Sequence, residues 1–386
     1  MGGGLMQLVA YGAQDIYLTG NPQITFFKVV YRRHTNFAIE SIEQTFNGTV
    51  DFGRKVSCTV SRNGDLIHKV YLQVDLPAFD DGSNTFGWVP SVGHALIDEV
   101  SVEIGGQTID KHYGEWLQIW NELTQTAEKE AGYDEMIGNT SALTTVDANA
   151  KPATTLYVPL QFWFCRNPGL ALPLIALQYH EVKFNITFRQ LADLRNGNSV
   201  ATASLGNASL YVDYIYLDTD ERRQFAQVQH EYLIEQLQFT GAESFTSTGI
   251  KSKLALNHPC KELVWVCQKD SNDITDFSFS GDQSIVDAKL QLNGHDRFSV
   301  RKAEYFNLVQ PYQHHTRIPA AGIYVYSFAL NPEQHQPSGT VNMSRIDNAT
   351  LLLNTESLTS YKLKVYAVNY NVLRIMAGMG GLAYSN

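Results

Sequence analysis

Apolar and polar residues alternate with a period of two along much of this chain. Between residues 69 and 76 every second side chain is valine or leucine, and the positions between them are lysine, tyrosine, glutamine and aspartate. The same alternation recurs at 100–104, 288–292 and 361–367. Successive side chains of a β-strand point to opposite faces, so each stretch is predicted to be a strand with one buried face.

Pairs of residues that favour tight turns lie beside several of these stretches. They are Asn63-Gly64, Gly105-Gly106 and Asn293-Gly294. Such pairs tolerate the positive φ angles of two-residue hairpin loops. We therefore expect antiparallel hairpins and an all-β architecture.

Helical periodicity is scarce and local. One amphipathic helix is predicted over 113–127, where apolar side chains recur every three or four residues. A shorter helix is predicted over 303–309, and Pro311 should stop it. Both are expected to be short helices within the loops of a β-protein.

One order of elements occurs twice. A hairpin turn, a short helix, a strand and an Asn-Pro loop follow one another in each half, with Asn167-Pro168 and Asn331-Pro332 marking the loops. The copies lie about 165 to 190 residues apart, and each is large enough for a domain. With 386 residues the chain also exceeds what one hydrophobic core usually serves. We expect two tandem β-sandwich domains that arose by an old duplication.

A third helix is predicted between the two copies. It would begin at Asp218, with Glu221 three residues later as a capping pair, and run through Phe225 toward Leu233. Its position makes it a connector between the two predicted domains.

Composition indicates which kinds of molecule the chain binds. The net charge is −10, and only 18% of the residues are charged. A nucleic-acid-binding chain would carry a basic stripe, so no direct contact with nucleic acid is expected. Aromatic residues make up 11% of the chain, which suits broad protein–protein interfaces.

Cysteine usage and the N-terminal residues indicate where the chain is made. Four cysteines occur without any C-x-x-C pair, so buried, reduced thiols are expected. The first residues show neither the charged region nor the apolar region of a signal peptide. The longest apolar run, 170–177, contains a proline and is too short to cross a bilayer. We expect synthesis in the cytoplasm, without a signal peptide or a transmembrane segment.

No motif for catalysis, cofactor binding or metal binding stands out. None of the 11 histidines has His, Asp or Glu two residues later, the spacing that places two ligands on one face of a strand. The doublet His314-His315 is interpreted as a surface or packed pair, and His258 near Cys260 lacks further activating groups. No Walker loop or G-x-S-x-G motif is present. We predict a protein that is not an enzyme and has no cofactor.

Six N-x-S/T sequons make glycosylation a further question. The candidates are Asn139, Asn207 and Asn348, of which the first two fall in predicted loops. Without a signal peptide, the endoplasmic-reticulum machinery would not reach them.

Several stretches, in order from the first residues to the last, carry a family resemblance. They are Gln7–Gly20, Asn21–Phe27, Tyr31–Phe37, Arg166–Gly169, Asp218–Phe225, His230–Glu235, Asn369–Arg374 and Gly378–Tyr384. Together they resemble the major capsid protein of nucleocytoplasmic large DNA viruses, closest to the phycodnavirus branch of algal and chlorella viruses.

The resemblance implies a fold and an assembly. The fold would be a double jelly roll, two tandem eight-stranded antiparallel barrels, with an N-terminal arm over 1–25, a first jelly roll over 26–217, a connector helix over 218–235 and a second jelly roll with the C-terminal tail over 236–386. Three chains would form a homotrimer, a pseudo-hexagonal capsomer that tiles the icosahedral shell of a large double-stranded DNA virus.

The resemblance also implies partners and modifications. Partners would be other copies in the trimer, neighbouring capsomers and minor capsid proteins beneath the shell, below which an internal membrane can lie. Family members carry glycans, sometimes outside the usual sequon, which weakens any argument from sequons alone. The rather compact loops leave open whether the chain is the dominant capsomer or a minor capsid paralogue.

Five aromatic residues cluster before the first clear strand of the repeat. They are Tyr11, Tyr17, Phe26, Phe27 and Tyr31. Since they precede the predicted barrel, we interpret them as an assembly arm that docks against another molecule.

Two other classes of protein would share the predicted β-architecture. A carbohydrate-binding or hydrolytic jelly roll would need a metal pair or paired carboxylates on one sheet face. A cell-surface adhesion module would need a secretion signal and, in most cases, disulfides. Neither set of features is seen in the sequence, so the capsid interpretation is preferred.

Overall fold

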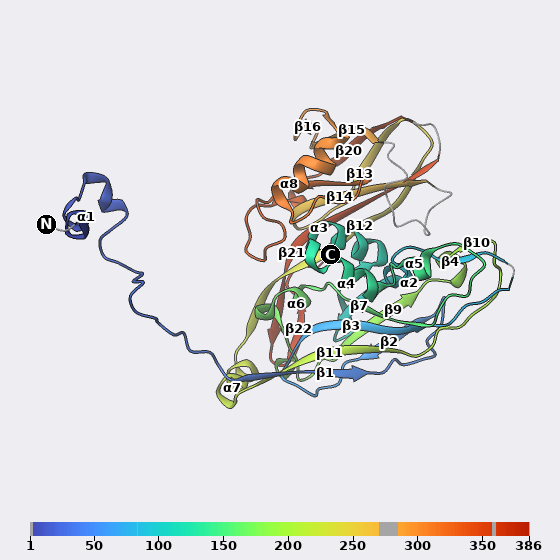
Figure 1. Cartoon of the computed structure of the whole chain (residues 1–386), viewed down its shortest axis with the longest axis horizontal. Helices are drawn as coiled ribbons and strands as arrows, with labels where there is room; N and C mark the ends of the chain where they lie inside the picture. Colours follow the sequence, from blue (N-terminus) through green and yellow to red (C-terminus); the bar gives the residue numbers. More distant parts are fainter. Residues whose placement is uncertain (1–2, 83, 270–284, 357–359, 386) are drawn as a thin grey trace. The chain divides into compact units, whose positions relative to one another are not determined.

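A computed structural model of the chain describes residues 3–82, 84–269, 285–356 and 360–385 (Figure 1). It divides into two compact units, residues 1–36 and 37–386. The first unit holds the helix α1 (Gly3–Val9) and a 3₁₀ turn, η1 (Ala13–Tyr17), and none of its described residues is buried. This segment therefore has no hydrophobic core of its own.

The first barrel consists of two antiparallel sheets. One has the order β1-β11-β3-β7, with the short β8 beside β3, and the other has the order β2-β9-β5-β6. The strands of the first sheet are β1 (Phe37–Gln44), β11 (Ala208–Leu217), β3 (Leu66–Leu76), β7 (Thr154–Pro159) and β8 (Leu172–Pro173). Those of the second are β2 (Lys55–Thr59), β9 (Val182–Phe188), β5 (Ile97–Ile104) and β6 (Gln107–Tyr113). A small separate ribbon pairs β4 (Phe86–Trp88) with β10 (Arg195–Gly197).

The second barrel repeats this plan. Its first sheet has the order β12-β21-β14-β18, with β19 beside β14 and β22 beside β21, and its second has the order β13-β20-β15-β16, with β17 beside β15. The strands of the first sheet are β12 (His230–Phe245), β21 (Tyr361–Met376), β14 (Pro259–Lys269), β18 (Ile323–Ser327), β19 (Val341–Asn342) and β22 (Met379–Leu382). Those of the second are β13 (Gly249–Leu254), β20 (Ala349–Thr355), β15 (Ile285–Leu292), β16 (His295–Asp296) and β17 (Arg301–Lys302).

The two barrels have the same strand order, element for element. In chain order β1, β2, β3, β5, β6, β7, β9 and β11 correspond to β12, β13, β14, β15, β16, β18, β20 and β21. Even the short strand after each Asn-Pro loop recurs, because β8 pairs with β3 and β19 pairs with β14. Eight strands in two four-stranded sheets are typical of a jelly roll. The predicted duplication and the double jelly roll are therefore confirmed.

Of the three predicted turns, two are hairpins. Gly105-Gly106 joins β5 to β6 and Asn293-Gly294 joins β15 to β16, all four residues having positive φ. Asn63-Gly64 is not a hairpin, because β2 and β3 lie in different sheets and the loop crosses between them. The glycine is needed there for space, since a Cβ at Gly64 would lie 2.8 Å from the Cβ of Tyr214.

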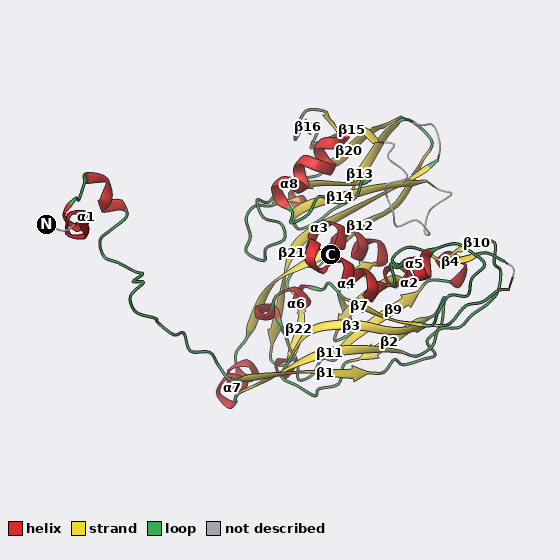
Figure 2. Ribbon diagram, in the orientation of Figure 1, coloured by secondary structure: helices red, strands yellow, loops and turns green. Residues whose placement is uncertain are grey.

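The helix predicted over 113–127 is two helices, α3 (Gly114–Thr124) and α4 (Ala127–Ile137). The chain is extended at Gln125 between them, and Trp116 and Trp120 of α3 are buried. The buried tryptophans give α3 its amphipathic pattern, whereas α4 is largely exposed. The other short helices of the first barrel lie in its loops (Figure 2). They are α2 (Val92–Leu96), α5 (Ser141–Thr144) and α6 (Trp163–Arg166).

Pro311 does not stop the helix predicted over 303–309. A π-helical turn, η7 (Tyr305–Val309), runs directly into α8 (Gln310–His314), and Pro311 lies in the first turn of α8. The first turn of a helix does not need the N–H that proline lacks, so proline is tolerated there.

The third helix, α7 (Thr219–Gln227), lies between β11 and β12 and is shorter than predicted. The Asp218 carboxylate accepts a hydrogen bond from the backbone N–H of Thr219, while no capping bond from Glu221 is made. The helix ends before Leu233 because β12 begins at His230 and pairs with β21 along its length. Long-range pairing here outweighs the local helical pattern.

One sheet of the second barrel separates the two hydrophobic cores. On β14, Val264 and Val266 belong to the first core, whereas Leu263, Trp265 and Cys267 belong to the second. Strands β18 and β21 divide their side chains in the same way. The stretch 361–367 was predicted to have one buried face, but 363–371 is buried on both. The outer face of this sheet is thus the surface on which the first barrel packs.

Candidate functional site

Elements of the first barrel cover the outer face of the β12-β21-β14-β18 sheet. They are β6, α3 and α6, which contact β12 and β21 through side chains and backbone. The backbone N–H of Leu237 donates to the Asp110 carboxylate at 3.1 Å, and the ring of Tyr113 lies 4.9 Å from that of Phe239. The interface between the barrels therefore combines aromatic packing with polar contacts.

A buried charged cluster joins α3 to β21. Lys364 Nζ lies 2.7 Å from Glu115 Oε1, and the hydroxyl of Tyr366 donates to Glu115 Oε2 at 2.8 Å. Arg189 approaches Glu115 at 3.6 Å, and the ring of Trp116 lies 5.6 Å from that of Tyr366. Burial, reinforced by the Glu115 carboxylate, raises the pKa of Tyr366 well above its usual value. The tyrosine is thus a fixed hydrogen-bond donor.

A second cluster joins α6 to β12 and β14. The Glu235 carboxylate lies 2.8 Å from Arg166 Nη1 and 2.7 Å from Nζ of the fully buried Lys261. The Arg166 guanidinium also lies over the ring of Trp120, 4.1 Å from its centroid. One carboxylate therefore faces both the buried Lys261 and the partly exposed Arg166 at the boundary between the barrels.

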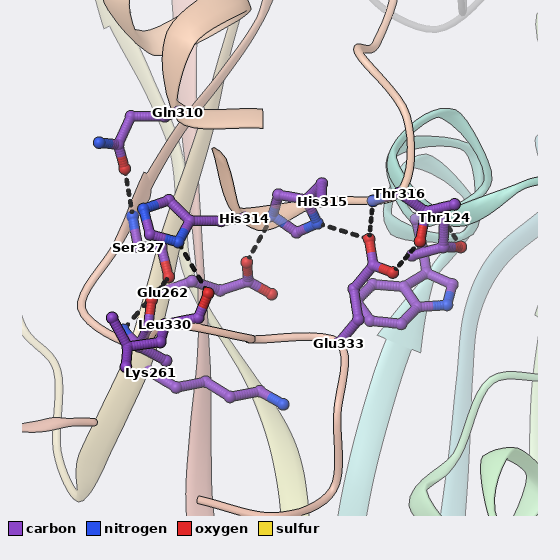
Figure 3. A network of polar contacts seen from close by, with 12 residues as sticks. Thr124, Lys261, Glu262, Gln310, His314, His315, Thr316, Ser327, Leu330 and Glu333 are labelled. Atoms are coloured by element: carbon purple, nitrogen blue, oxygen red, sulfur yellow. Dashed lines mark hydrogen bonds and ion pairs between the residues drawn. The ribbon is translucent and has the colours of Figure 1, made fainter. Parts of the chain in front are cut away.

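A third cluster surrounds His315 (Figure 3). Its Nε2 lies 3.0 Å from Glu262 and its Nδ1 lies 2.9 Å from Glu333, and Glu333 also accepts from the backbone N–H of Thr316 at 2.8 Å. Burial alone would lower the pKa of His315, but the two carboxylates outweigh burial and raise it to about 9. The ring is therefore a cation held between two anions.

These three clusters hold elements together and do not form a reactive centre. Each charged side chain lies beside at least one of opposite charge, which is the usual arrangement of buried structural ion pairs. Cys260, near His258, is fully buried, and burial raises the pKa of its thiol far above the range of a nucleophile. His314 Nδ1 donates to the carbonyl of Leu330, 2.9 Å away, whereas His315 contacts Glu262 and Glu333.

The described residues include neither a metal-binding group nor a membrane-spanning helix. In residues 3–82, 84–269, 285–356 and 360–385 no group of three His, Cys, Asp or Glu side chains could hold a metal ion. Within the same part of the chain no helix is both long and apolar enough to cross a membrane.

The three candidate asparagines for glycosylation all lie at exposed positions. Asn139 follows α4, Asn207 precedes β11 and Asn348 precedes β20. The Asn139 side chain donates to Asp134 at 3.2 Å, whereas the other two are held by backbone hydrogen bonds. All three side chains are accessible, and their modification stays a prediction.

The five aromatic residues of the proposed arm all lie in the unit 1–36 and are all exposed. The exposed fractions are 62% for Tyr11, 89% for Tyr17, 89% for Phe26, 99% for Phe27 and 86% for Tyr31. The structure does not bring them together into a cluster of rings. Their role in assembly stays a prediction.

Sequence reasoning missed a row of tyrosines on the outer face of the β1-β11-β3-β7 sheet. The ring of Tyr71 stacks on that of Tyr211 at 5.2 Å and lies 6.3 Å from that of Tyr157. A groove of about 880 Å³ runs beside the rings and is lined by Lys69 and Asp213, among others. In the sequence, Tyr71 merely occupied the polar side of an alternating strand, so no local signal pointed to this surface.

Sequence comparisons give the relatives of this chain. A family model described as "Major capsid protein N-terminus" matches residues 25–218, and one described as "Large eukaryotic DNA virus major capsid protein" matches residues 221–381. The major capsid proteins of Pyramimonas orientalis virus and Paramecium bursaria Chlorella virus 1 are 60% and 46% identical to it, each alignment covering 100% of both chains.

Solved structures give the same answer. The chain superposes on one from the PBCV-1 virus capsid with a TM-score of 0.81 and 41% identity, over 94% of this chain and 100% of that one. The Faustovirus major capsid protein, at 13% identity, shares the fold with a TM-score of 0.79, over 95% of this chain and 94% of that one. The resemblance stated from sequence motifs is confirmed, including its place near the algal-virus branch.

Proposed function

The chain belongs to the family of major capsid proteins of large eukaryotic DNA viruses, and from this premise we propose that three copies assemble into one pseudo-hexagonal capsomer. It is a structural component of the icosahedral capsid and not an enzyme. The alternatives of a minor capsid paralogue or a carbohydrate-binding jelly roll are not favoured by these relatives. Its place is therefore the shell of the virion.

The duplicated barrel is the observation that supports the trimer. Each chain contributes two barrels with the same strand order. Three chains related by a three-fold axis would present six similar barrels, so a trimer can occupy a six-fold position of a lattice. Closed cyclic symmetry of this kind is the common way in which soluble chains associate.

Further partners belong to the proposal as well. Neighbouring capsomers would meet at the sides of the barrels, and minor capsid proteins would lie beneath the shell, without direct contact between this chain and nucleic acid. The arm over 1–25 precedes the first jelly roll, the connector and the second jelly roll, and it would contact a neighbour or an inner protein. Glycans on Asn139, Asn207 or Asn348 would decorate exposed loops.

The mass of the purified chain in solution tests the proposal. Multi-angle light scattering should give three times the chain mass of 43.2 kDa. Negative-stain images of the same sample should show particles with six lobes. A stable monomer, or a dimer, would contradict the proposed capsomer.

A further inference from the structure

One sheet face in the first barrel is the counterpart of a face that is buried in the second. On β14, β18 and β21 the side chains of Val264, Val325 and Tyr366 face the first barrel and are all 0% exposed. Val264 pairs directly with Val325 on one side and with Tyr366 on the other. These three side chains form the row against which the first barrel packs.

The corresponding strands β3, β7 and β11 carry the three tyrosines, here called the tyrosine face (Tyr71, Tyr157 and Tyr211). Tyr71 pairs with Tyr211 on β11 and with Pro159 on β7, which is the same arrangement of one central and two flanking strands. None of the three tyrosines is buried, and Tyr157 is 39% exposed. The face equivalent to this buried row is therefore a partly exposed aromatic surface.

The second barrel exposes the elements that would complete the same contact with another chain. In the first barrel, α3 and Arg166, the residue before Asn167-Pro168, cover the partner sheet. Their counterparts in the second barrel are η7 with α8, and Leu330, the residue before Asn331-Pro332. These counterparts expose an apolar surface, here called the helix face, with exposed fractions of 45% for Leu308, 40% for Val309, 78% for Tyr312 and 69% for Leu330.

We infer that the helix face of one copy docks on the tyrosine face of the next copy, and so repeats between chains the contact that joins the two barrels within a chain. The inference rests on the proposed trimer and assigns its two surfaces. The contact is head-to-tail, with different surfaces on the two partners. Each chain would use its helix face to contact the tyrosine face of the next chain. The ring closes when the helix face of the third chain contacts the tyrosine face of the first.

The chemistry of the two surfaces fits an interface between proteins. Aromatic anchors dominate the energy of such interfaces when they enter a pocket that excludes water. The groove of about 880 Å³ beside the tyrosine face is lined by Tyr71, Tyr157 and Pro159 and is flanked by the charges of Lys69 and Asp213. Tyr312 and Leu330 are side chains of the type such a groove accepts. Tyr312 would be left largely in water if no partner covered it.

Aspartate substitutions test the two surfaces separately. Tyr157→Asp and Tyr312→Asp change exposed side chains, so each variant should fold, with a melting temperature close to that of the unchanged protein. Both should sediment as monomers at concentrations where the unchanged protein is a trimer, with at least a tenfold weaker association. Val200→Asp is the matched control, because Val200 is 77% exposed and belongs to neither surface, and it should stay trimeric.

Cross-linking tests the head-to-tail arrangement. The four native cysteines are buried, so they should react little with a flexible bis-maleimide. A chain carrying both Tyr157→Cys and Tyr312→Cys should give covalent trimers on a denaturing gel, whereas each single variant should stay uncross-linked.

The outcomes of these experiments distinguish the assigned surfaces from the trimer itself. A trimer that survives both aspartate substitutions, or that gives no cross-links in the double variant, overturns the assigned surfaces and leaves the trimer standing. Cross-linked dimers from a single variant would show a symmetric contact and would also overturn the assignment. An unchanged protein that sediments as a monomer overturns the trimer and this inference together.

Discussion

Buried charges at the boundary of the two barrels each have a partner from another element. Glu235 on β12 stands between Arg166 on α6 and Lys261 on β14. Such a cluster adds little stability compared with apolar packing, but removal of one member leaves an uncompensated charge in a poorly solvated place. The clusters therefore favour one relative placement of the barrels, since any other placement would expose unpaired charges.

Glu235→Gln should therefore destabilise the protein strongly. Loss of the carboxylate removes the ion-pair partner that Arg166 and Lys261 share and should cost about 3–5 kcal/mol in the free energy of unfolding. Urea denaturation measures the difference. Glu231→Gln on the same strand is the control, because Glu231 and Arg374 form an exposed pair whose loss should cost less than about 1 kcal/mol. Equal losses in the two variants would show that the buried cluster stabilises the fold no more than the exposed pair does.

The His315 cluster should make stability depend on pH in the alkaline range. The pKa of His315 is raised in the folded chain to about 9, above the value of about 6.5 in the unfolded chain. The stabilisation is thus fully present below pH 6.5 and is lost as the pH rises through 9, by roughly 3 kcal/mol at most. Urea midpoints measured from pH 6 to pH 10 would show the decline.

His315→Gln provides the comparison. The variant should be less stable at pH 6 and should lose the part of the decline that falls between pH 6.5 and 9. If its stability fell with pH as steeply as that of the unchanged protein, the decline would belong to other groups. The sequence could not show that Glu262 and Glu333 contact His315, because they reach it only in the folded barrel.

Among the elements, the local alternation of residues predicted where strands lie, but not which of their faces are covered by distant parts of the chain. Alternation at 69–76 and 100–104 reflects one core and one outer face, and β3 and β5 lie there. Strand β21 is buried on both faces because another barrel, distant in sequence, packs against it. The predicted helix at 218–233 was too long for the same reason. Strand β12 begins at His230 and pairs with β21, so the helix α7 ends before it.

The N-terminal segment is the element whose contribution to the fold is smallest. Because no described residue of 1–36 is buried, deletion of 1–25 should leave folded trimers with an unchanged melting temperature. We expect those trimers to fail to assemble into shells, as seen by electron microscopy. A full-length chain with Tyr11, Tyr17, Phe26, Phe27 and Tyr31 changed to serine should fail in the same way. Loss of trimers, or normal shells, would contradict this role.

In the whole molecule, duplication of the barrel allows one kind of contact between barrels to be used both within a chain and between chains, so that three chains form a ring. The outer sheet face of the second barrel is covered by the first barrel of the same chain. The equivalent tyrosine face of the first barrel is available to another copy. The sequence showed that the architecture repeats, and motifs showed the family. Which surfaces remain uncovered depends on the packing of the barrels, so only the structure distinguishes the tyrosine face from an ordinary polar strand face.

A reconstruction of the assembled capsomer by electron cryomicroscopy tests the central claim most directly. We expect three chains per capsomer, six barrels in a ring, and α8 with Leu330 of each chain against Tyr71, Tyr157 and Tyr211 of the next. A capsomer built from six chains, or a trimer in which the tyrosine face is open to solvent, would contradict this arrangement.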